Sequence, residues 1–68
     1  MILIEATEIR EDARKRMLLE DDEEFDLEYL DTKVYDGKKL RCFRLSQNGK
    51  NCGIVYENWL DPKVLELL

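Results

Sequence analysis

Residues 25–57 read FDLEYLDTKVYDGKKLRCFRLSQNGKNCGIVYE and decide the fold of this 68-residue chain. Apolar and acidic residues alternate from Phe25 to Tyr29, which is the two-residue period of a β-strand. The dipeptides Asp-Gly at 36–37 and Asn-Gly at 48–49 both favour tight hairpin turns. This pattern predicts a three-stranded antiparallel β-meander with strands over residues 27–35, 38–45 and 51–57.

The two turns also predict which residues lie opposite each other. A two-residue loop at 36–37 places Tyr35 opposite Lys38 and Leu30 opposite Phe43. A four-residue loop at 47–50 places Phe43 opposite Ile54. Because opposed residues share a face of the sheet, the predicted core face consists of Leu30, Val34, Phe43, Leu45, Cys52, Ile54 and Tyr56. The predicted second face carries Leu27, Tyr29, Tyr35, Leu40, Cys42 and Val55, and a β-bulge in either hairpin would exchange the faces.

The segments that flank the meander predict two helices and a further strand. Thr7 is the expected N-cap of a helix over residues 8–22. The apolar stripe of that helix is Ile9, Ala13 and Met17. Asp61 and Pro62 suit the cap and first position of a short C-terminal helix. We therefore expect one α+β domain over residues 1–68, with the N-terminal helix packed on the meander and residues 1–6 as a short strand or lead-in.

The composition favours a cytoplasmic protein that is not an enzyme. No apolar run approaches the roughly 20 residues that span a bilayer, and the N-terminal run is too short for a signal-peptide core. The chain has no histidine and two cysteines, Cys42 and Cys52. It lacks the usual four zinc ligands and the side chain best suited to acid–base catalysis near neutral pH. We expect no catalytic residue, metal or cofactor, and two free thiols on opposite faces of the sheet.

Charge is sorted along the sequence into an acidic block and a basic block. Residues 20–31 hold eight acids and no base: Glu20, Asp21, Asp22, Glu23, Glu24, Asp26, Glu28 and Asp31. Residues 32–53 hold six bases, Lys33, Lys38, Lys39, Arg41, Arg44 and Lys50, against the single acid Asp36. The formal net charge is −5. The arrangement predicts a strongly dipolar small domain.

The acidic block supports three interpretations: a solvated segment that pairs with the basic hairpin, a docking site for a basic protein, or a surface that imitates nucleic-acid phosphate. A helical block would carry one charge per ~2.3 Å, close to the ~1.7 Å of duplex DNA, whereas an extended block carries one per ~5 Å. We favour a phage-type inhibitor of a nuclease, restriction or CRISPR-like enzyme. All eight acids would then contact the basic surface of a nucleic-acid-binding protein.

Two alternatives use other parts of the chain. The basic hairpin over residues 38–44, with its neighbouring aromatic residues, would serve a small regulatory or nucleic-acid-binding module. Direct nucleic-acid binding is not expected of so acidic a chain, however. The second sheet face would expose an apolar patch unless a terminal segment covers it, and would then dock a partner subunit or a second copy in a homodimer. No membrane partner is expected.

Overall fold

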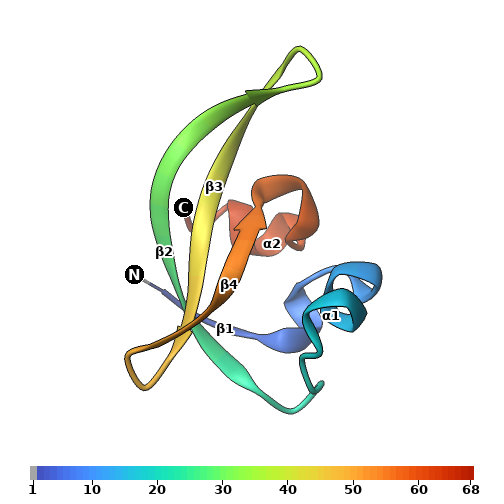
Figure 1. Cartoon of the computed structure of the whole chain (residues 1–68), viewed down its shortest axis with the longest axis vertical. Coiled ribbons are helices and arrows are strands. Elements are labelled where there is room, and N and C mark those ends of the chain that lie inside the picture. The colour runs from blue at the N-terminus through green and yellow to red at the C-terminus, as the bar shows by residue number, and fades with distance from the viewer. Residues whose placement is uncertain (1) are drawn as a thin grey trace.

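A computed structural model describes residues 2–68, and Figure 1 shows how their elements are arranged. In chain order these are β1 (Ile2–Glu5), the 3-10 turn η1 (Ala6–Glu8), α1 (Glu11–Met17), β2 (Glu24–Tyr35), β3 (Lys38–Gln47), β4 (Lys50–Tyr56), the 3-10 turn η2 (Glu57–Trp59) and α2 (Pro62–Leu65). The predicted N-terminal strand is present from Ile2 onward, and Met1 lies outside the described residues.

The four strands form one antiparallel sheet in the order β1-β2-β3-β4, which confirms the α+β class and the meander. Asp36 and Gly37 have φ of 51° and 75°, as a tight hairpin turn requires. Asn48 and Gly49 adopt nearly the same conformation, with φ of 50° and 80°. The second loop therefore has two residues and not the predicted four, and residues 47 and 50 are opposite each other.

The first hairpin departs from the predicted register at one residue of β2. Tyr35 lies opposite Lys38, as expected, and the pairing continues regularly to Asp31. Leu30 is then an extra residue, so that Tyr29 and not Leu30 lies opposite Phe43. This β-bulge reverses the faces of all β2 residues that precede it, because side chains alternate along a strand.

The second hairpin contains a similar irregularity. Ser46 lies opposite Asn51, as the pairing of Phe43 with Ile54 would require, but Leu45 lies opposite Gly53 and not opposite Cys52. Phe43 consequently lies opposite Val55, and its predicted pairing with Ile54 is wrong. The extra residue again moves one strand by a single position.

These two shifts decide which apolar residues enter the core. Leu27 and Val55, which the sequence predicts on the second face, are buried. Leu30, Val34 and Ile54, which the sequence predicts on the core face, are exposed. The buried cluster consists of Ile4, Ala6, Ile9, Ala13, Phe25, Leu27, Phe43, Leu45, Val55, Leu60 and Val64. The predicted apolar second face therefore does not exist as one surface.

The helical segments are shorter than predicted. The helix expected over residues 8–22 is only the seven-residue α1, which ends where Leu18 takes a left-handed conformation with φ of 59°. A continued helix would place the acids of residues 20–24 at its C-terminal end, where the helix dipole disfavours them. Thr7 lies in η1 and is not the N-cap. Asp61 does cap α2, since its carboxylate accepts a hydrogen bond from the Lys63 N–H.

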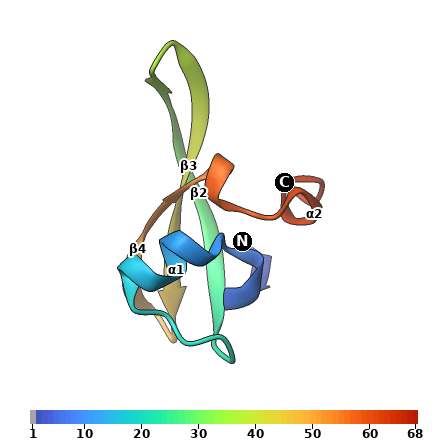
Figure 2. The same ribbon diagram turned by 90° about the vertical axis from the view of Figure 1, so that its right-hand side faces the viewer.

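The β2–β3 hairpin projects from the rest of the molecule (Figures 1 and 2). β1 pairs with β2 only over residues 24–27, and β4 pairs with β3 only from Cys42 onward. Every residue from 29 to 39 is exposed to solvent. We refer to residues 29–39 as the arm.

Candidate protein-binding surface

The predicted acidic site begins in the loop between α1 and β2 and continues along β2. Figure 1 shows this loop at the opposite end of the longest axis from the tip of the arm. Glu20, Asp21 and Asp22 are exposed in the loop. Backbone hydrogen bonding from the Glu23 N–H to the Glu20 carbonyl oxygen, at 3.2 Å, makes the loop a compact turn.

The strand part of the site places its acids on the outer face of the sheet. Phe25 and Leu27 are buried, so the alternate residues Glu24, Asp26 and Glu28 point away from the core. Neighbouring carboxylates in this row are about 6.8 Å apart along the strand. The charge density is thus well below that of the helical block considered above.

Glu5 joins this row from β1 and is not among the predicted acids. It lies directly opposite Glu24, so the two residues share the outer face. Glu5 lies in a stretch whose charges balance, and only the pairing of β1 with β2 brings it to the acidic block. The sequence of residues 2–5, Ile-Leu-Ile-Glu, does not alternate, so no sequence signal gives its direction; the burial of Ile4 in the structure does.

Two of the eight predicted acids form ion pairs within the chain. The Asp21 Oδ1 lies 3.4 Å from Arg14 Nε, and the Glu28 Oε1 lies 3.0 Å from Arg44 Nη2. Both pairs are at least partly exposed to solvent, so their contribution to stability is small. They nonetheless neutralise these two acids locally.

Glu23 is held by hydrogen bonds rather than by a base. Its carboxylate accepts a hydrogen bond from the Glu20 N–H at 2.7 Å and one from Gln47 Nε2 at 2.9 Å. These two hydrogen bonds hold the pKa of Glu23 below its ordinary value, and the bond from the Glu20 N–H has the larger effect. Glu23 therefore organises the loop and tethers it to the end of β3.

Asp31 lies apart from the other predicted acids. It is on the far side of the Leu30 bulge, on the exposed arm. When the two paired acids, Glu23 and Asp31 are set aside, one cluster of acids remains that has no ion pair with any residue of the described range 2–68. We call this cluster the acidic end; its members are Glu5, Glu20, Asp22, Glu24 and Asp26.

The bases of the predicted basic block differ in whether they form an ion pair. Arg41 pairs with Glu57 at 3.4 Å, and Arg44 pairs with Glu28 as described. Lys33, Lys38 and Lys39 are exposed on the arm and form no ion pair with residues 2–68. These three lysines are therefore separated in space from the acidic end, whereas Lys50, opposite Gln47 at the start of β4, lies near it.

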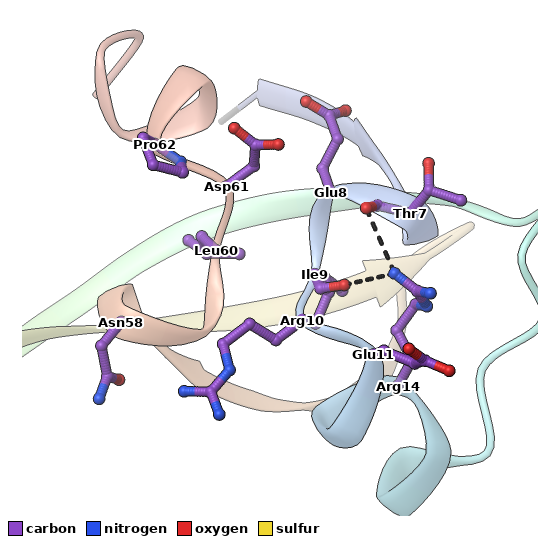
Figure 3. Close-up of a pocket in the computed structure, with 10 residues that line it drawn as sticks. All are labelled: Thr7, Glu8, Ile9, Arg10, Glu11, Arg14, Asn58, Leu60, Asp61 and Pro62. Carbon is purple, nitrogen blue, oxygen red and sulfur yellow. Dashed lines mark hydrogen bonds between the residues drawn. The ribbon is translucent and has the colours of Figure 1, made fainter.

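A cleft of about 490 Å³ lies between the η1–α1 junction and the η2–α2 segment. Figure 3 shows Arg10 and Arg14 beside it. Arg14 Nη1 donates hydrogen bonds to the carbonyl oxygens of Ile9, at 2.6 Å, and Thr7, at 3.3 Å. Arg10 pairs with Asp12 at 2.9 Å. Both guanidinium groups are already engaged, and Arg14 in particular ties η1 to α1.

Both cysteines are free thiols in the structure. Cys52 packs against the buried cluster, whereas Cys42 alternates with the core residue Phe43 and points to the other face. The prediction that the two cysteines lie on opposite faces is confirmed. Across residues 2–68, no three side chains of the metal-ligating types gather as a metal site would require.

No family model matches this chain, and comparisons with curated proteins and with solved structures found no match. None of the helices in residues 2–68 has both the length and the apolar character needed to cross a bilayer.

Proposed function

We propose that this chain is a non-enzymatic binding protein whose acidic end docks on the basic surface of a nucleic-acid-handling enzyme and blocks its nucleic-acid site. The observation that supports this proposal is the cluster of five carboxylates without an internal base, at the end opposite the lysines of the arm. Charge separation of this kind steers a small protein toward an oppositely charged partner and orients it on approach.

The energetics of the isolated chain also favour a basic partner. Glu5 and Glu24 are cross-strand neighbours, and like charges in that position are destabilising. Lysine or arginine side chains from a partner would relieve this repulsion. Since Glu5, Glu24 and Asp26 lie on paired strands, binding would require little ordering of the backbone.

The charges of the acidic end are more widely spaced than the phosphates of nucleic acid. A carboxylate every ~6.8 Å along β2 compares with one phosphate per ~3.4 Å of axis in a single DNA strand. The proposed interaction therefore depends on a few charge pairs, together with the adjoining loop acids Glu20 and Asp22. Its affinity should fall steeply as salt shortens the screening length.

The test uses two double variants that change the net charge equally. Glu24→Gln/Asp26→Asn removes two acids of the acidic end, whereas Asp21→Asn/Glu28→Gln removes two acids that are already paired. Each protein is immobilised, exposed to an extract of the cells in which the chain occurs, and washed with a short DNA duplex. Proteins that the duplex releases are identified and purified.

The purified proteins are then bound to labelled duplex DNA, and each variant is added as a competitor. We expect wild type and the paired-acid variant to displace DNA, and the acidic-end variant to do so about 10- to 100-fold less well. Equal competition by the two variants, or the absence of any protein released by DNA, would contradict the proposal. If the chain itself retained labelled DNA and charge reversal at Lys38 and Lys39 abolished this, the basic arm would be the functional surface instead.

A further inference from the structure

The outer edge of β2 has no strand partner along the arm. β1 covers β2 only as far as Leu27, and within the described range 2–68 the later residues of β2 pair with β3 alone, apart from the bulged Leu30. A long free strand edge presents unpaired N–H and C=O groups, which are a template for another strand. A two-stranded ribbon is also only marginally stable by itself in water.

The turn geometry identifies which backbone groups face outward. Tyr35 and Lys38 flank the two-residue loop and form the first pair of the hairpin. In an antiparallel ladder the N–H and C=O of alternate residues point to the same neighbour. Residues 35, 33 and 31 therefore face β3, and the backbone groups of Thr32 and Val34 face the open edge.

The side chains along this edge are complementary to themselves under a two-fold rotation. If Thr32 lies opposite Thr32 of a second copy, Asp31 lies opposite Lys33 of that copy, and the same pair occurs again by symmetry. Asp31 and Lys33 are two residues apart on a regular stretch of strand, so they share a face. Leu30 then lies opposite Val34, two exposed apolar residues.

Only the register centred on Thr32 places Asp31 of each copy opposite Lys33 of the other. Centring the pairing on Asp31 or on Lys33 places two like charges opposite each other, which is destabilising. The Leu30 bulge ends the regular edge on one side, and the turn at 36–37 ends it on the other. The charges along the edge thus favour the register centred on Thr32 and disfavour the two neighbouring registers, which bring like charges together.

We propose that β2 pairs edge to edge with β2 of a second copy, antiparallel and centred on Thr32, to form a two-fold symmetric dimer. The pairing joins the two arms and leaves both acidic ends at the outside. It involves about five residues from each copy, so the interface is smaller than that of a permanent dimer. The dimer should therefore form and dissociate with concentration. This proposal does not rest on the proposed function.

The first test is a charge exchange measured by sedimentation over roughly 10 µM to 1 mM protein. Asp31→Lys and Lys33→Asp should each raise the dimer dissociation constant about 10-fold, because each creates two like-charge pairs. The combined variant Asp31→Lys/Lys33→Asp should restore wild-type association. Lys39→Asp makes the same change of charge on β3, away from the edge, and should have little effect.

The second test concerns the backbone. Thr32→Pro removes the outward N–H and should abolish association, while proline is tolerated on an edge strand. Thr32→Val keeps that N–H and removes only the hydroxyl, which contacts Tyr29 Oη at 2.8 Å, so it is the matched control. If Thr32→Pro unfolds, the charge exchange decides alone. A wild type that stays monomeric throughout, or a combined variant no better than either single one, would overturn the proposal.

Discussion

Glu5 and Glu24 lie directly opposite each other on β1 and β2, and neither pairs with a base of the described residues 2–68. Repulsion between opposed like charges typically costs about 0.2–1 kcal/mol. A cost of this kind, retained in a domain with little stability to spare, is consistent with a surface that is neutralised by a partner.

Removing one charge of this pair should stabilise the isolated domain. We expect Glu24→Gln to raise the free energy of unfolding by about 0.2–1 kcal/mol in urea titrations at low salt. Added salt should shrink the gain, because screening already weakens the repulsion in wild type. Glu28→Gln is the control: it breaks an ion pair with Arg44, so it should give no gain. Equal stabilisation by both variants would contradict the cross-strand explanation.

Gly53 should not tolerate a side chain. Its φ is 142°, a conformation that residues with a Cβ rarely adopt, and a Cβ there would lie 2.5 Å from Met17 Cε. We expect Gly53→Ala to lower the free energy of unfolding by about 1–3 kcal/mol. Met17 Cε is the end of a flexible side chain that can move aside, so in a Met17→Ala background most of the cost, which comes from the backbone, should persist. A neutral Gly53→Ala would show that β4 can relax at this bulge.

Glu57 should make stability depend on pH in the acid range. The hydrogen bond from the Arg41 N–H, at 2.6 Å, is the main cause that holds the pKa of Glu57 below its ordinary value. A carboxylate with a lowered pKa contributes stability above its unfolded pKa of about 4.3, and this is lost as pH falls through the folded pKa. Glu57→Gln should therefore cost about 1 kcal/mol at neutral pH, with the difference from wild type shrinking below roughly pH 4.

Chemical denaturation at a series of pH values checks this expectation. Asp36→Asn, at the exposed turn, removes an acid that accepts no hydrogen bond among the described residues and should leave the pH profile unchanged. A constant difference between wild type and Glu57→Gln from pH 7 to pH 3 would show that the carboxylate charge is not what matters.

Within the C-terminal segment, Val64 should contribute far more to stability than Leu67. Val64 is completely buried, whereas Leu67 is 72% exposed. Val64→Ala should therefore lower the free energy of unfolding by about 2 kcal/mol, and Leu67→Ala by less than about 0.5 kcal/mol. Thermal or urea unfolding of the two variants measures this contrast. Similar costs at both positions would mean that the segment packs differently from the arrangement described.

Short-range preferences were enough to predict the elements with strong local signals. Both hairpin turns follow from residues that accept positive φ, and Asp61-Pro62 marks the start of α2 at the correct residue. The charge blocks were also readable directly, since they are a property of the order of residues. The length of α1 was not predictable in this way, because its apolar stripe continues into Leu18, which is 86% exposed.

The sequence by itself thus determined the meander, its two tight turns and the separation of acids from bases. Only the tertiary structure decided the bulges at Leu30 and Cys52, because whether a strand gains an extra residue depends on which side chains the core can accommodate across both faces. The tertiary structure also decided which acids remain without an ion pair inside the chain. Arg14 reaches Asp21, Arg44 reaches Glu28, and β1 brings Glu5 beside Glu24, each through contacts between segments that local preferences do not place together.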